Sequence, residues 1–176
     1  MRQKKKIFKI YFEGKSDKIY FEALRSLDIF RNSNYKLDLE DLKGQGNLLK
    51  KLNSGEIYKN FEKIAFIFDK DNLNSNEINP HESYIIGFSN PKFEVWLLAH
   101  YTKKIKDAYL NNTTLLDKDL DRYIPNYKKA DPRISDLAKT YEIAIGNIQG
   151  KNELDFEKVC TTVDNVIKEI LKEEEW

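Results

Sequence analysis

The chain has 176 residues, of which 40% are apolar and 34% charged, and its formal net charge is +1. That apolar share supports one compact domain rather than a disordered chain, and the near-neutral charge gives no overall attraction to nucleic acids or membranes. One Cys excludes an internal disulfide. Because only two His are present, carboxylates must supply most ligands of any bound metal, which favours Mg²⁺ or Mn²⁺.

Predicted strands and helices alternate in the first half of the chain. Short β-rich runs bounded by turn residues predict strands over residues 6–12, 35–39, 63–68 and 83–88. Ser16 is expected to cap a helix that runs to about Leu27, and a second helix follows the turn at 43–47. This order predicts an α/β fold for residues 6–100, with an open, mostly parallel β-sheet flanked by helices.

Helical periodicity dominates the second half. One helix is expected to begin at Pro132, and Asn152 is expected to cap a last helix whose apolar stripe runs from Phe156 to Ile170. We therefore expect residues 101–176 to form a helical C-terminal extension that packs on the core as part of a single compact unit.

No segment has the pattern of a leader or a membrane span. The longest apolar runs, IAFIF and VWLLA, contain five residues each, whereas a bilayer requires about 20. Residues 1–6 are basic, but Lys9 and Glu13 interrupt the apolar stretch that follows them. We expect a cytoplasmic protein without a membrane partner.

Acidic residues follow the two strongest predicted strands. Glu13 comes directly after the first of them, and Asp69 and Asp71 come after residues 63–68. The carboxyl ends of neighbouring parallel strands lie about 5 Å apart, so the three carboxylates could converge on one divalent cation. Asp residues at strand ends also make turns, and it is the addition of Glu13 that favours a metal site.

A second unusual segment is SNPKFEVWLLAH, in which Asn90 and Pro91 are expected to cap and open a helix. Glu94 lies among apolar residues there, and a buried carboxylate must be paired or bound to metal. At a helix start it can instead face solvent, where the helix dipole favours an acid, and the residues alone favour that position. His100, one turn beyond Trp96, fits a core or boundary residue better than a ligand.

Three segments together resemble the RloB family, also called AbiLii-like, whose members carry a Toprim-type fold. They are IYFEGKSDKIYFEAL, FIFDKDN and FSNPKFEVWLLAH, and the last is the most specific. A weaker similarity lies at Tyr127, Lys128 and Lys129, where packing is also a sufficient role for the Tyr ring. The resemblance extends from about residue 6 to 150. The chain has Ser16 and Asp17 where the family usually has Thr-Glu.

The resemblance implies a Toprim-like, metal-dependent nuclease. It makes Asp69 and Asp71 metal ligands and Glu13 a metal ligand or general acid/base, and it places Glu94 near the same site. The implied cofactor is Mg²⁺ (or Mn²⁺), which prefers hard oxygen ligands and offsets charge during phosphodiester cleavage.

Cationic and polar residues near these acids have implied roles on phosphate. Lys15 is expected to assist catalysis by stabilising transition-state charge. The residues expected to contact substrate are Lys18, Lys70, Asn90, His100 and Lys128. Each of Lys15, Lys18 and Lys70, taken singly, is at least as well explained as a solvated surface residue.

The family resemblance also implies bacterial defence against phage by abortive infection, with a partner ATPase of the ABC or OLD type. The chain itself lacks G-x-x-x-x-G-K-[ST], and the glycines of KGQGN fit a turn. The substrate would be nucleic acid, either RNA (including tRNA) or DNA. Two alternatives remain open: a catalytically silent module that binds nucleic acid or a partner, and a phosphohydrolase acting on a nucleotide. Homo-oligomerisation is also left open.

Overall fold

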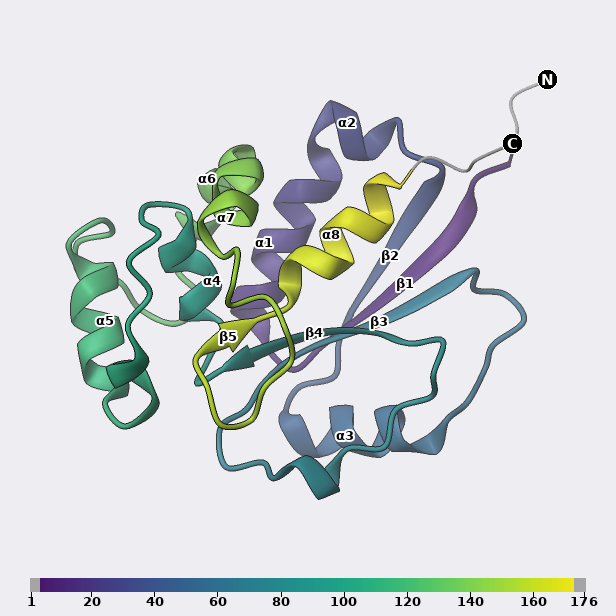
Figure 1. Ribbon diagram of the computed structural model, residues 1–176. Coiled ribbons are helices and arrows are strands. Elements are labelled where there is room, and N and C mark those ends of the chain that lie inside the picture. The colour runs from purple at the N-terminus through teal and green to yellow at the C-terminus, as the bar shows by residue number, and fades with distance from the viewer. Residues whose placement is uncertain (1–3, 173–176) are drawn as a thin grey trace.

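The computed structural model describes residues 4–172, within which five strands form one sheet in the order β2-β1-β3-β4-β5 (Figure 1). The strands are β1 (Lys6–Phe12), β2 (Tyr35–Asp41), β3 (Lys63–Asp69), β4 (Ile85–Asn90) and β5 (Cys160–Thr161). Strand β1 pairs in parallel with β2 and β3, and β3 pairs in parallel with β4, whereas β5 is antiparallel to β4. The predicted α/β fold with an open, mostly parallel sheet is confirmed.

Helices cover both faces of this sheet (Figure 1). They are α1 (Lys15–Ser26), α2 (Asp28–Arg31), α3 (Gln45–Ser54), α4 (Glu94–Ala99), α5 (Thr113–Asp121), α6 (Ile134–Leu137), α7 (Tyr141–Asn147) and α8 (Val163–Leu171). Short 3-10 turns lie at Ser75–Glu77, Asp107–Leu110 and Ala138–Thr140. Helices α1 and α8 lie on one face, α3 lies on the other, and α4 to α7 gather beyond the carboxyl ends of the central strands (Figure 1).

Alternation along the central strands divides the core in two, because successive side chains of a strand point to opposite faces. Phe8, Ile10 and Phe12 of β1 belong to the larger apolar cluster, which includes buried residues of α1, α4 and α8. Tyr11, on the other face of β1, packs in a smaller cluster with Leu48 of α3. The sheet is therefore buried on both faces, as expected for parallel strands.

The C-terminal helix differs from the sequence prediction. We expected a helix capped by Asn152, but α8 begins at Val163 and a loop and strand β5 precede it. The amide of Asn90 explains the difference, because it donates hydrogen bonds to the backbone carbonyls of Asp155, Phe156 and Lys158 at 2.8–3.1 Å. These bonds hold the segment in an irregular path that a helix could not follow.

Three other predicted boundaries also differ. Helix α1 begins at Lys15, and Ser16 is not its cap, since the Ser16 hydroxyl accepts a hydrogen bond from the Ala130 backbone at 2.9 Å. The helix expected from Pro132 consists of three short pieces, α6, a 3-10 turn and α7, and α4 begins at Glu94 rather than at the proline. No helix among residues 4–172 is long and apolar enough to cross a membrane.

Candidate metal centre

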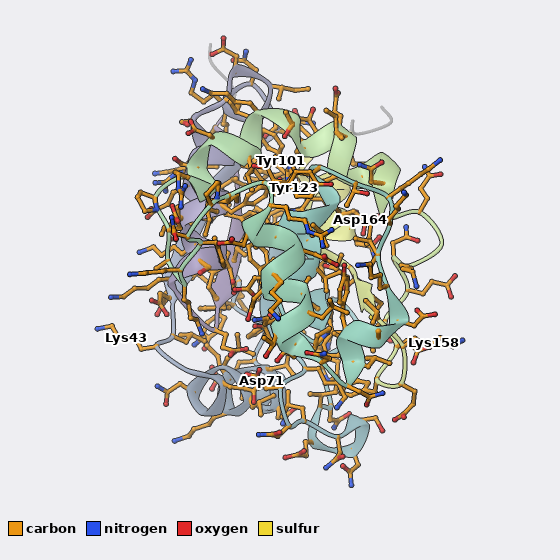
Figure 2. The ribbon with its side chains drawn as sticks, turned by 90° about the vertical axis from the view of Figure 1, so that its left-hand side faces the viewer. Lys43, Asp71, Tyr101, Tyr123, Lys158 and Asp164 are labelled. Carbon is orange, nitrogen blue, oxygen red and sulfur yellow. The ribbon has the colours of Figure 1, made fainter. Side chains whose placement is uncertain are left out.

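The site begins where two parallel strands end side by side. In the register of β1 and β3, Phe12 lies opposite Ile67, and the Glu13 backbone then donates to the Ile67 carbonyl at 3.1 Å. Asp69 is the last residue of β3. One carboxylate oxygen from each of Glu13, Asp69 and Asp71 lies within 4.8 Å of the others, and Figure 2 labels Asp71 at this edge. The convergence predicted for these three acids is confirmed.

Glu13 is held in a fixed orientation. Its Oε2 accepts the Asp69 backbone N–H at 2.9 Å and lies 3.5 Å from the Gln45 side-chain amide. The same amide donates to the Asp69 carbonyl at 2.8 Å, so the first residue of α3 ties both strand ends together. Burial raises the pKa of Glu13, and the hydrogen bond from Asp69 opposes that rise.

Asp71 reaches the site from a tight turn after β3. Its φ of 44° lies in the left-handed region, which Asp tolerates better than most residues because its short side chain can hydrogen-bond locally. The turn is fixed by bonds from the Lys70 backbone to Ser89 at 2.8 Å and from Leu73 to Lys70 at 2.7 Å. The residue therefore both makes the turn and contributes to the acidic cluster.

Two further acids complete the site from helices. Asp17 in the first turn of α1 and Glu94 at the start of α4 are only 6% and 7% exposed. Both line a cavity of about 330 Å³ that also contains the three acids of the cluster. The hydroxyl of Tyr127 donates to Glu94 Oε1 at 3.1 Å. The solvent-facing position favoured for Glu94 is therefore wrong, because the carboxylate is buried and faces the other acids.

Crowding of these acids raises their proton affinity. Burial raises the pKa of Asp17 well above its usual range, and the charges of Glu13 and Glu94 add to the effect. Burial also raises the pKa of Asp69, followed by the charges of Asp17 and Glu13. A divalent cation among these oxygens would offset both the repulsion and the desolvation. The donor set, all hard carboxylate oxygens, therefore fits Mg²⁺ or Mn²⁺.

Only some of the lysines predicted to act on substrate line a cavity at the site. Lys128 lines the acidic cavity, and so does Lys92, which the sequence did not single out. Lys70 lines a neighbouring cavity. Lys15 is exposed and Lys18 pairs with Glu22 of the same helix at 3.6 Å, and neither lines a cavity at the site.

Asn90 and His100 have structural partners. The Asn90 amide is occupied by the three backbone carbonyls that shape the loop before β5. His100 is 5% exposed, packs edge-on against Tyr20 and Trp96, and lies 3.0 Å from the Thr140 hydroxyl through Nδ1. The structure thus places His100 in the core, outside the residues that line either cavity.

Sequence reasoning missed Asp17, Gln45 and Lys92 as site residues. A signal existed for Asp17, because it lies four residues after Glu13 in the first turn of a helix that starts at the same sheet edge. Gln45 and Lys92 gave no signal, since their roles depend on where α3 and the loop before α4 meet the strand ends.

The fold and these contacts define an α/β protein with a candidate acidic metal centre at the carboxyl edge of its parallel sheet. The model of the RloB-like protein family matches residues 8–170. The chain therefore belongs to the RloB-like protein family. No curated protein and no solved structure matches it.

Proposed function

We propose that this protein is a divalent-metal-dependent, Toprim-like nuclease that cleaves phosphodiester bonds in RNA, tRNA included, or in DNA. The observation that carries the proposal is the convergence of the Glu13, Asp69 and Asp71 carboxylates within 4.8 Å. These residues would hold Mg²⁺ or Mn²⁺. When bound, such a cation offsets charge on the reacting phosphate and lowers the pKa of a bound water.

The remaining acids of the cavity have roles of their own in this proposal. Glu94 is oriented by the Tyr127 hydroxyl, which fixes one oxygen and leaves the other to accept a proton from an attacking water. Glu13 is fixed by the Asp69 backbone and Gln45, so its geometry does not depend on a flexible rotamer. Both groups are preorganised by elements of the core.

Cations around the cavity support a phosphate substrate. Lys92, Lys128 and Lys129 line it together with the acids. Lys92 is paired with Asp117 at 2.5 Å, whereas Lys128 and Lys129 are exposed. We assign phosphate contacts to Lys128 and Lys129, whose ammonium groups offset charge on a nucleic-acid backbone.

The near-neutral charge of the chain suggests that a partner helps it to bind nucleic acid. Non-specific affinity for nucleic acid comes largely from phosphate neutralisation, and a net charge of +1 supplies little of it. We therefore propose that a partner ATPase of the ABC or OLD type recruits or activates the protein in abortive infection against phage. The family resemblance of the sequence supports this partner.

The test is a cleavage assay with labelled tRNA, single-stranded RNA and plasmid DNA, in Mg²⁺, in Mn²⁺ or in EDTA. Wild-type protein is compared with the double variant Glu13→Gln, Asp69→Asn. The matched control is Glu82→Gln, Asp136→Asn, which makes the same chemical changes at exposed positions outside the site.

We expect metal-dependent cleavage that the double variant loses and the control retains. Cleavage that persists in EDTA or in the double variant would overturn the proposal. If the chain alone is inactive, the assay is repeated with the proposed partner ATPase and ATP. If no cleavage occurs with the ATPase and ATP either, the protein is better explained as a catalytically silent binding module.

A further inference from the structure

A larger cavity of about 800 Å³ opens beside the acidic one. Asp71 and Lys92 line both cavities, so the two are contiguous. The wall of the larger cavity comes from the turn after β3, the start of α5 and the loop before β5. Figure 2 shows this face, with Asp71 below α5 and Lys158 of the loop to its right. Its volume is in the range of small-molecule sites.

One cation in this cavity is available to an anion. Lys70 is half-buried and lies between Asp69 and Asp71 in sequence, and it forms no ion pair within residues 4–172. Lys92, by contrast, is paired with Asp117. A phosphate at the boundary of the two cavities would therefore meet the Lys70 ammonium group.

Uncharged polar side chains also line the cavity. Asn72, Asn111 and Thr113 are exposed, and their side chains have no hydrogen-bond partner in the described part of the chain. Asn90, which also lines the cavity, is occupied by backbone carbonyls. The side-chain amides of Asn72 and Asn111 can each donate and accept a hydrogen bond. Side chains with both capacities recognise the edge of a nucleobase.

An aromatic ring forms another part of the wall. Phe156 is half-buried, and the centroid of its ring lies 4.8 Å from that of Phe88 in the core. That contact holds the ring in place, and Phe156 lines the cavity together with Leu110. Aromatic rings held in this way stack nucleobases in single-stranded nucleic-acid sites.

We propose that this cavity is a nucleoside-binding subsite that receives the nucleotide adjoining the phosphate at the acidic cluster. Phe156 stacks the base, Asn72 and Asn111 read its edge, and Lys70 contacts the phosphate. Two lysines and two acids balance across the lining, which suits a neutral heterocycle with one phosphate better than a polyanion. The position of the phosphate rests on the proposed nuclease function, whereas nucleotide binding itself does not.

The experiment measures binding of four nucleoside 5′-monophosphates, ribose 5-phosphate and inorganic phosphate by calorimetry in EDTA. Stacking of one base contributes about 1–3 kcal/mol, so we expect nucleotides to bind about 5- to 150-fold more tightly than ribose 5-phosphate. Phe156→Leu should reduce this ratio to near one. Asn72→Ala with Asn111→Ala should flatten the preference among the four bases, and the exposed Asn165→Ala on α8 is the matched control.

Equal binding of ribose 5-phosphate and nucleotides, or the absence of saturable binding by any nucleotide, would overturn the subsite. If Phe156→Leu does not fold by circular dichroism, the two asparagine substitutions at exposed positions carry the test. Glu13→Gln separates this inference from the proposed function, because it should abolish cleavage without weakening nucleotide binding in EDTA. Cleavage without base-dependent binding would retain the nuclease and reject the subsite.

Discussion

His100 is a titratable residue that the fold keeps neutral. Thr140 donates its hydroxyl proton to the Leu137 carbonyl at 3.1 Å, so it accepts a hydrogen bond from His100 Nδ1. The other ring nitrogen, Nε2, is buried and has no partner within the described residues. Burial lowers the pKa of His100 from 6.5 to about 3. A second proton on this ring would be a buried charge without an acceptor, which is costly.

This shift predicts an acid-sensitive contribution to stability. Between pH 6.5 and about 3 the unfolded chain binds a proton at His100 that the native protein does not, so the free energy of unfolding falls as pH falls. The loss between pH 8 and pH 5 should be about 2 kcal/mol. The variant His100→Gln retains a hydrogen-bond donor for Thr140 but cannot titrate. Its free energy of unfolding, measured with urea, should fall between pH 8 and pH 5 by about 2 kcal/mol less than that of wild type. Identical pH profiles for the two proteins would contradict the prediction.

The acids show how far single residues could be interpreted from sequence. Glu13, Asp69 and Asp71 were predictable because strand ends in a parallel sheet share an edge. From the residues alone Glu94 was misplaced, because its burial depends on Tyr127, a residue distant in sequence that no periodic pattern links to it. The family resemblance placed Glu94 correctly, near the other acids of the cavity. Asp17 was passed over because the first turn of a helix is an ordinary position for an acid.

At the scale of elements, strands were predicted better than helices. Strands β1 and β3 match their predicted ranges to within one residue, because continuous apolar β-rich runs between turns have few other interpretations. The segment before α8 was predicted as helix because its apolar residues have helical spacing. The long-range bonds of Asn90 override that local preference, and no feature of residues 152–159 reveals them.

Packing of α8 on the sheet depends on a glycine in β4. A Cβ at Gly87 would lie 2.6 Å from Ile67 Cδ1 on β3 and 3.3 Å from Val166 Cγ2 on α8. Gly87→Ala should therefore destabilise the protein by about 1–2 kcal/mol, the usual cost of an overpacked core. Chemical denaturation measures the change.

The matched control for this substitution is Gly146→Ala in α7. No atom lies within 4 Å of a Cβ built at Gly146, and alanine is the better helix former. It should leave stability unchanged or raise it by up to about 1 kcal/mol. A destabilisation equal to that of Gly87→Ala would show that the clash with Ile67 and Val166 is not the cause.

At the scale of the whole molecule, the acidic cluster joins parts of the chain that are distant in sequence. Glu13 follows β1, Asp69 ends β3, and Gln45 of α3 bonds to both of them. Metal-free, the cluster opposes folding, since burial and mutual repulsion raise the pKa values of Glu13 and Asp69. A cation that binds these carboxylates only in the folded protein would offset their repulsion and stabilise the entire domain.

Divalent metal should therefore raise the melting temperature of the protein. At about 100 times its dissociation constant, a ligand specific for the folded state adds about 2.7 kcal/mol, or roughly 5–10 °C for a domain of this size. Differential scanning calorimetry in Mg²⁺ or Mn²⁺, against NaCl at equal ionic strength, measures the shift.

The double variant Glu13→Gln, Asp69→Asn identifies the site that produces this shift. It should be more stable than wild type in EDTA, because two crowded charges are removed, and it should lose the response to metal. The exposed pair Glu82→Gln, Asp136→Asn should retain that response. A shift that survives in the double variant would place the bound cation elsewhere on the chain, and the convergence of carboxylates in the acidic cluster would then need another explanation.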